Sequence, residues 1–221
     1  MSDKVLLKPS EERLFCAEDI PLLTAQVSLP YTENNNGRFN RYYRIFQQKF
    51  EQYCSKELFP RAEAAYFRAK EEAGAIPQWR SEVKSTITLE KDGILSLFCD
   101  TIVTGTPQRQ VRRQGDTWDM TRGLFLQLSD CFPARAPWKA RLLEHAEKVI
   151  ESEEKAGLSH YHDGWRSKLR SSFHAHRFYL SEEGLHFFFP FGSLAAGEIS
   201  DFLLPFSEKN GPFLPNIFAK K

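Results

Sequence analysis

The sequence has no long apolar segment, no charge excess and few cysteines. No run approaches the roughly 18 apolar residues of a membrane-spanning helix, and the first ten residues lack the apolar stretch of a signal peptide. The 30 Lys and Arg nearly balance the 29 Asp and Glu, so a net charge of +1 gives no general attraction to nucleic acid. We therefore expect no membrane span in this chain, no nucleic-acid partner and, as written, a cytoplasmic location. An extracytoplasmic location would follow if a leader or anchor had been removed.

The sequence also lacks the local signatures of common catalytic sites. It has no serine-hydrolase elbow, no Gly-rich phosphate loop and no dinucleotide fingerprint. Cys16, Cys54, Cys99 and Cys131 are far apart, without a Cys-x-x-Cys pair or a nearby His pair at zinc-ligand spacing. We interpret them as free, mostly buried thiols; a disulfide becomes plausible only if a leader was trimmed. These observations predict no cofactor and favour a protein that is not an enzyme.

Aromatic residues, by contrast, are abundant, with 19 Phe, 7 Tyr and 4 Trp. Pleated sheets accommodate such side chains better than helix bundles need them, which favours a β-containing core. The densest stretch is 178–206, where we expect three strands, an acidic turn that closes on Gly184, and Pro205 at a sheet edge. His186 alternates with apolar neighbours there and is interpreted as facing solvent.

The remaining pattern predicts the order of the elements. One or two strands precede residue 36, and a long helix with an aromatic stripe follows, kinked or restarted at Pro60 and ending near Gly74. Hairpins at 83–103 and 118–128 flank a polar loop at 105–115, and two shorter helices precede the closing strands. The predicted fold is α+β: an antiparallel sheet built from hairpins, packed against one long helix and two shorter helices. We expect a single domain, 1–221, with its core at about 20–208.

Several motifs in this order resemble a known family. The resemblance is to the domain of unknown function that forms the extracytoplasmic part of the anti-sigma factor RsiV and also occurs in the peptidoglycan deacetylase PdaC. It covers roughly residues 20–208. The motifs that carry it are Trp118-Asp119-Met120-Thr121-Arg122-Gly123, then Leu126, Leu128, Asp130 and Phe132, then Phe178-Tyr179-Leu180 with Gly184-Leu185, then Ala195-Ala196-Gly197 and Pro205.

This resemblance implies a non-catalytic recognition module with a protein or a cell-wall-related ligand as its partner. In RsiV this type of domain binds lysozyme, and in the deacetylase the chemistry resides in another domain. The chain departs from the family where Thr104-Gly105-Thr106-Pro107 replaces a Gly-Gly-Ala-His-Pro signature, so a property that depends on that His is not carried over. The matching turn residues also have structural roles: Asp119 and Thr121 can bond the turn that Gly123 completes, and Asp130 can cap the next turn.

Arg109, Arg112 and Arg113 form the only local basic patch of the sequence. Their guanidinium groups could hold a phosphate, a carboxylate or an acidic partner in the 105–115 loop. The alternative is an ordinary solvated hairpin loop. This patch is the candidate binding site, and it also fits a third hypothesis, a cytoplasmic regulatory partner protein.

A rival hypothesis is a metal-dependent hydrolase. His160, His162, His174 and His176, with Asp163, are the densest set of potential ligands. Residues two apart diverge on a helix, so these side chains would converge only in a special loop geometry. They are weak metal candidates, and surface or capping roles are the commoner outcome for histidines.

Overall fold

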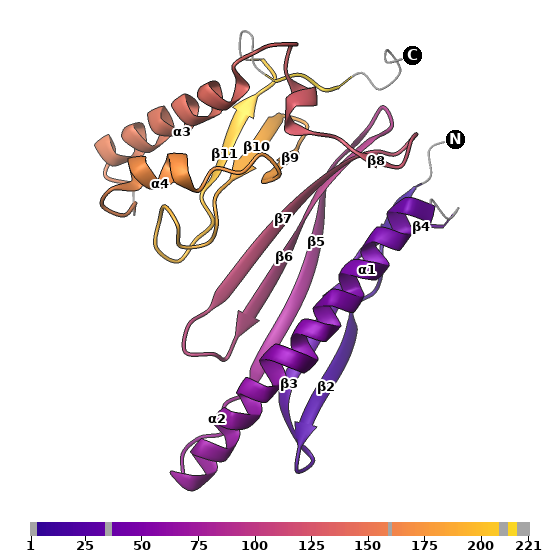
Figure 1. Cartoon of the computed structure of the whole chain (residues 1–221), viewed down its shortest axis with the longest axis vertical. Coiled ribbons are helices and arrows are strands. Elements are labelled where there is room, and N and C mark those ends of the chain that lie inside the picture. The colour runs from indigo at the N-terminus through magenta and orange to yellow at the C-terminus, as the bar shows by residue number, and fades with distance from the viewer. Residues whose placement is uncertain (1–3, 34–36, 159–160, 208–211, 216–221) are drawn as a thin grey trace. The chain divides into compact units, whose positions relative to one another are not determined.

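The computed structural model describes residues 4–33, 37–158, 161–207 and 212–215. The chain divides into two compact units, one formed by 1–85 and 99–112 and the other by 86–98 and 113–221. Figure 1 shows the elements of both units, coloured along the chain. The single domain expected from the sequence stays a prediction. Three strands contribute residues to both units: β5 (Trp79–Lys91), β6 (Ile94–Thr104) and β7 (Gln110–Asp119).

The strands before the long helix number four in the described residues, against the one or two expected. The main sheet has the order β2-β3-β5-β6-β7-β8, and β1 and β4 form a separate antiparallel ladder. β3 pairs with β5 in parallel, unlike its antiparallel pairing with β2, because the long helix carries the chain back between these two strands. The strands are β1 (Val5–Leu7), β2 (Glu11–Ala17), β3 (Ile20–Ser28) and β4 (Pro30–Thr32).

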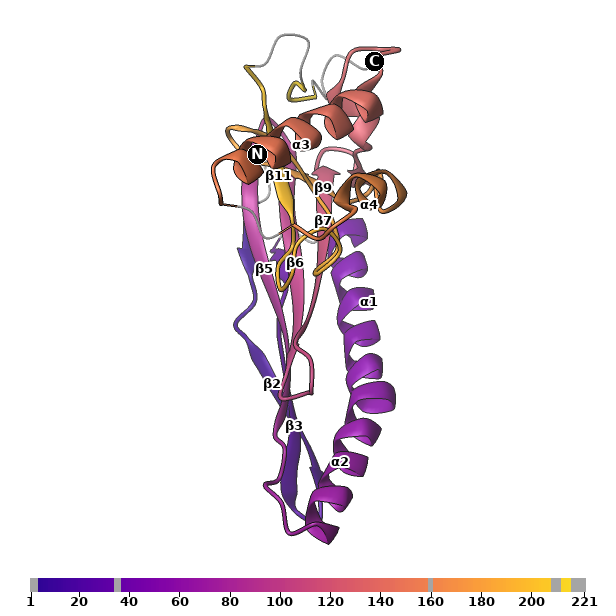
Figure 2. The ribbon, with the colours of Figure 1, turned by 90° about the vertical axis from the view of Figure 1, so that its left-hand side faces the viewer.

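The expected long helix is present and has an irregular turn before Pro60. It comprises α1 (Gly37–Tyr53), a single π turn η1 (Cys54–Leu58) and α2 (Phe59–Glu71). Pro60 lies in the first turn of α2, where its missing N–H is tolerated, so the helix restarts there as the sequence indicates. α1 contacts β4 (Figure 1), and α2 contacts β3 (Figure 2). The aromatic stripe of α1 buries Phe39, Tyr43 and Phe50.

One exposed ionic contact ties the β2–β3 turn to α2. Glu18 Oε2 accepts hydrogen bonds from the Tyr66 hydroxyl and from Lys70 Nζ, both at 2.7 Å. Lys70 and the Tyr66 hydroxyl lower the pKa of the Glu18 carboxyl. Because both charged side chains are about half exposed, solvent screens this pair and we expect it to add little stability.

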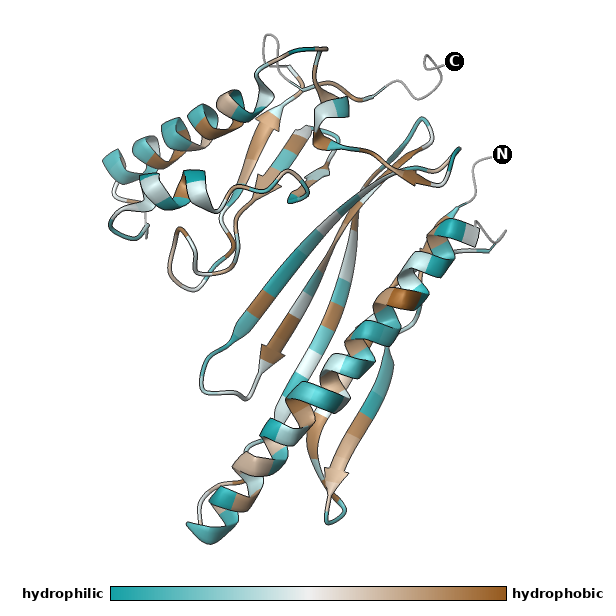
Figure 3. Ribbon diagram, in the orientation of Figure 1, coloured by the Kyte–Doolittle hydropathy of each residue, from teal (hydrophilic) through white to brown (hydrophobic). Residues whose placement is uncertain are grey.

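The second unit contains the closing strands and the two shorter helices, as expected. β9 (Phe178–Leu180), β10 (Gly184–Phe188) and β11 (Asp201–Pro205) form an antiparallel sheet in the order β11-β10-β9. Figure 3 shows hydrophilic and hydrophobic residues alternating around α3, which buries Leu142, Ala146 and Ile150 in a core shared with β10 and β11. The other elements are β8 (Leu124–Phe125), the 3-10 helix η2 (Leu128–Cys131), α3 (Trp138–Lys155) and α4 (Trp165–Ser171).

The turn motifs that carried the family resemblance have the structural roles expected of them. Asp119 Oδ1 accepts hydrogen bonds from the backbone N–H groups of Thr121 and Arg122, both at 3.0 Å. Gly123, at φ +63°, donates its N–H to the Asp119 carbonyl. Asp130 caps η2 by accepting the Gln127 N–H at 2.9 Å. These contacts explain the motif as turn chemistry.

The cysteines also match their interpretation. All four are free; Cys54, Cys99 and Cys131 are buried, whereas Cys16 is exposed. Burial raises the pKa of the Cys54 thiol to about 11 and that of Cys131 to about 12. Both are therefore protonated near neutral pH and poor nucleophiles.

Candidate functional site

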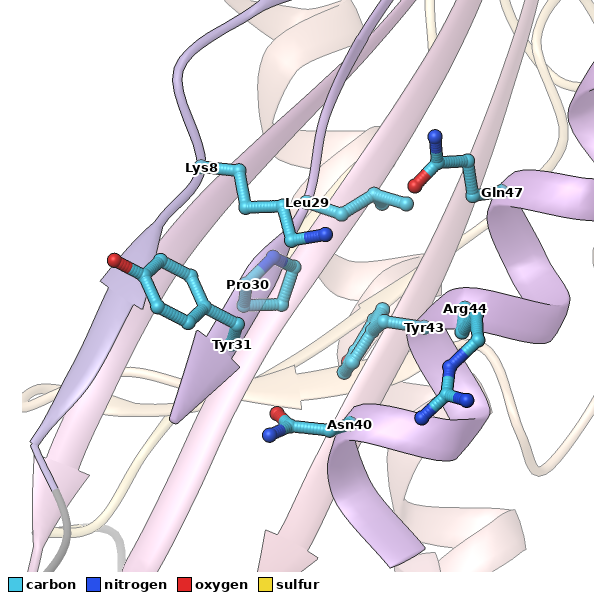
Figure 4. A pocket seen from close by; sticks show the side chains of 8 residues that line it. All are labelled: Lys8, Leu29, Pro30, Tyr31, Asn40, Tyr43, Arg44 and Gln47. Atoms are coloured by element: carbon cyan, nitrogen blue, oxygen red, sulfur yellow. The ribbon is translucent and has the colours of Figure 1, made fainter. Parts of the chain in front are cut away.

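The candidate site is a cavity in the first unit, between α1 and the β1–β4 ladder (Figure 4). Its volume is about 280 Å³. This is at the small end of the range of ligand pockets, roughly 300–1,000 Å³. Residues of α1 lie on one side, and residues of β4 with the adjoining Lys8 and Leu29 lie on the other. The cavity is lined by Lys8, Leu29, Pro30, Tyr31, Asn40, Tyr43, Arg44 and Gln47.

The walls of the cavity are fixed by contacts between the ladder and the helix. Asn40 Oδ1 accepts the backbone N–H of Thr32, and Asn40 Nδ2 donates to the Thr32 carbonyl, both at 2.9 Å. This two-bond clamp joins β4 to the first turns of α1. On the strand side, the Lys8 N–H donates to the Leu29 carbonyl at 3.0 Å. These hydrogen bonds hold the strand side and the helix side of the lining in place, which favours a preformed site.

The floor of the cavity is apolar, and its charged groups are both cationic. Leu29 and Tyr43 are each 3% exposed, and Pro30 is buried as well. Lys8 and Arg44 are exposed. Among the residues that the structure describes, no acidic side chain lines the cavity. A lining of this kind suits an anionic group carried on an apolar body.

Gln47, which lines the cavity, is hydrogen-bonded to two carboxylates. Its Nε2 donates to Glu11 Oε2 and to Glu51 Oε1, both at 3.1 Å. The amide nitrogen thereby uses both of its N–H groups, which leaves the Gln47 carbonyl oxygen as an acceptor. Glu11 and Glu51 are held by this amide and do not line the cavity.

The arginine patch predicted from sequence is divided by the secondary structure. β7 begins at Gln110, so Arg112 and Arg113 lie on a strand and only Arg109 lies in the loop. Adjacent strand residues face opposite sides of a sheet. Accordingly, Arg112 is exposed near Tyr53, whereas Arg113 is 16% exposed and pairs with Asp201. The structure does not bring the three guanidinium groups to one point.

The histidines do not form a metal centre within the described ranges, where no group of three or more His, Cys, Asp or Glu side chains is close enough to hold an ion. His160 lies outside the described residues. His162 contacts the Gly192 carbonyl through Nε2 at 3.2 Å. His174 and His176 are exposed, with ring centroids 6.3 Å apart.

His186 proves to be part of a polar cluster, which corrects its interpretation as a solvent-facing residue. Its Nδ1 lies 3.2 Å from Asp201 Oδ1 and its Nε2 lies 3.1 Å from Ser181 Oγ. Its ring stacks on Tyr179 at a centroid distance of 4.5 Å. Asp201 Oδ2 also accepts hydrogen bonds from Tyr179 Oη and Arg113 Nη1, both at 2.7 Å. The His side chain is 20% exposed because β9, β11 and Arg113 surround this network.

Ser181, His186 and Asp201 are hydrogen-bonded in the same sequence of contacts as a serine-hydrolase triad, with the imidazole between the hydroxyl and the carboxylate. The surroundings of this cluster nevertheless favour a structural role. Ser181 Oγ accepts the backbone N–H groups of Glu183 and Gly184 at 3.3 and 3.4 Å, which is a local turn motif. Asp201 is shared with an arginine and a tyrosine. The cluster therefore serves to fix the β9–β10 turn against β11.

The architecture identifies the class: the chain has the DUF3298 fold, that of the RsiV/PdaC-type domain, so the predicted resemblance is confirmed at the level of the fold. It is similar to a DUF3298 protein of Bacteroides fragilis with a TM-score of 0.65 and 13% identity, covering 95% of this chain and 96% of that one. It is also similar to one of Pseudomonas aeruginosa PAO1, with a TM-score of 0.61, 16% identity and 97% of each chain covered. No family model and no curated protein matches the sequence. None of the described helices is long and apolar enough to cross a bilayer.

Sequence reasoning missed the cavity residues. Lys8 follows a three-residue strand and Arg44 lies on the polar face of an amphipathic helix, where cations are routine. Nothing in their spacing joins them, because the β1–β4 pairing that brings them together is long-range. The run of three arginines was the stronger signal in the sequence, yet strand alternation separates two of its members.

Proposed function

We propose that this chain is a non-catalytic recognition domain that binds its ligand in the cavity between α1 and the β1–β4 ladder. The observation that carries the proposal is the lining of this cavity, which combines an apolar floor with two cationic side chains and has no acidic side chain among the residues that the structure describes. The DUF3298 fold supports it, because the family resemblance implies recognition. A protein partner would reach the same face of the unit through exposed side chains such as Lys8 and Arg44.

A ligand screen by thermal unfolding tests this proposal. Because a ligand that binds only the folded state stabilises it, a ligand at ten times its Kd should raise Tm by about 3–6 °C. We expect active compounds to stabilise the parent chain, to remain chemically unchanged, and to lose their effect in the double variant Lys8→Glu, Arg44→Glu. The matched control is Lys49→Glu, Arg68→Glu, which changes two exposed cations of α1 and α2 outside the cavity. Hits that stabilise both double variants equally, or that are consumed, would contradict the proposal.

The Ser181 cluster provides a separate test of the non-catalytic assignment. A fluorophosphonate labels an activated serine: the Oγ–P bond forms, fluoride leaves, and the hydroxyl proton passes to the His base. We expect no adduct at Ser181 by intact-mass measurement, because its Oγ is held by two backbone amides. A stoichiometric adduct that disappears in both Ser181→Ala and His186→Ala would replace recognition with acyl-transfer chemistry.

A further inference from the structure

We propose that the cavity binds a small organic carboxylate, with the carboxylate held by Lys8 and Arg44 and the body of the molecule on the apolar floor. This inference rests on the proposed function and names the class of ligand. The cavity volume of about 280 Å³ limits the ligand to a small molecule or to one terminal group of a larger one.

The charges of the lining residues favour a ligand with a negative charge. Both charged residues of the described lining are cationic, and the carboxylates of Glu11 and Glu51 lie outside it, hydrogen-bonded to Gln47. Arginine offers paired N–H donors in a planar fork, which match the two oxygens of a carboxylate, and lysine adds a point charge. A cationic ligand would find no compensating charge in this lining.

The uncharged lining residues favour an organic body over a bare inorganic anion. Leu29, Pro30 and Tyr43 are buried and contribute apolar surface to the cavity. Tyr31 is half-buried, and an aromatic face next to a floor of this kind can contact a planar ring. Gln47 retains its carbonyl oxygen as an acceptor for an N–H or O–H group of the ligand. Phosphate would use the cations and leave this surface unoccupied.

Asn40 has a positioning role in this site. Both bonds of its clamp go to the backbone of Thr32, so its amide holds β4 against α1. The distance between the strand side and the helix side of the cavity therefore depends on Asn40, while the ligand charge is met by Lys8 and Arg44.

Paired acids and neutral analogues test the inference on the full chain. Calorimetric titration would compare hippurate with hippuramide, and D-glucuronate with D-glucose, with inorganic phosphate as the anion lacking an organic body. We expect at least one acid to bind about tenfold or more tightly than its neutral partner, since charge-assisted hydrogen bonds are lost in the neutral compound. Lys8→Gln and Arg44→Gln should each weaken that acid about tenfold, whereas the control Lys49→Gln should leave its affinity unchanged.

Each contrary result has a distinct meaning. Equal binding of acid and neutral partner, an unaffected Arg44→Gln variant, or no binding of either acid would overturn the carboxylate assignment. Phosphate binding as tight as that of the acids, with the same dependence on Arg44, would show that the organic body is irrelevant. The proposed recognition function would still hold if the ligand screen found a compound whose stabilising effect requires Lys8 and Arg44. If the screen found no such compound, both the carboxylate assignment and the recognition proposal would be wrong.

Discussion

Replacement of Gly115 by alanine is expected to lower the free energy of unfolding by about 3 kcal/mol or more, among the larger effects of a single substitution. A Cβ at this position would lie 2.1 Å from the Phe178 carbonyl oxygen and 2.8 Å from its carbon. Both atoms are backbone, so a rotamer change cannot relieve the clash. β7 or β9 must move, and the tie between these elements weakens. Urea unfolding of the parent chain and of Gly115→Ala measures the difference.

Gly37→Ala is the matched control for this prediction. A Cβ at Gly37 meets no heavy atom within 4 Å, and the residue begins α1. Without a clash, only the difference in helix propensity acts, so stability should change by at most about 1 kcal/mol in either direction. If Gly115→Ala unfolds at the same urea concentration as Gly37→Ala, the close approach of β9 to β7 is wrong.

Gly115 also shows where the sequence is ambiguous. A glycine ten residues after Gly105, with a polar segment between, predicts a loop, yet β7 runs from Gln110 to Asp119 through this position. The glycine is required by the approach of another strand and does not mark a turn. The positions of that strand and of the β3–β5 parallel pair depend on long-range contacts, which local pattern does not encode.

Turns and helix starts that depend on neighbouring residues could be predicted from the sequence. The Asp92-Gly93 turn joins β5 to β6, Pro60 lies in the first turn of α2, and Asp119 and Asp130 accept the hydrogen bonds of their own turns. The candidate site was less predictable for the same reason. Lys8 and Arg44 are 36 positions apart in the numbering and line one cavity because β4 pairs with β1 and is clamped to α1. The contact between His186 and Asp201 likewise depends on the pairing of β10 with β11, which are separated in the sequence.

Substitution of Asp201 by alanine is expected to cost about 2–4 kcal/mol of unfolding free energy, the second large effect. The carboxylate is 21% exposed and is bonded to Arg113, Tyr179 and His186. The guanidinium of Arg113 is 16% exposed and lies 4.0 Å from the Phe98 ring centroid, so it cannot reach water freely once the carboxylate is removed. Chemical unfolding measures the loss, and Asp201→Asn should cost less because its amide keeps an acceptor for Tyr179.

The control for Asp201 is Glu144→Ala, which breaks the exposed ion pair with Lys148. Solvent screens that pair, so its loss should not change the urea midpoint measurably. A double-mutant cycle between Asp201→Ala and Arg113→Met then isolates their coupling, since removing both charges leaves no buried cation behind. Arg113→Met should therefore recover part of the stability lost in Asp201→Ala. If Asp201→Ala is as neutral as Glu144→Ala, the cluster does not fix β11 against β9 and β10, and the triad-like order of Ser181, His186 and Asp201 would need an explanation other than structural support.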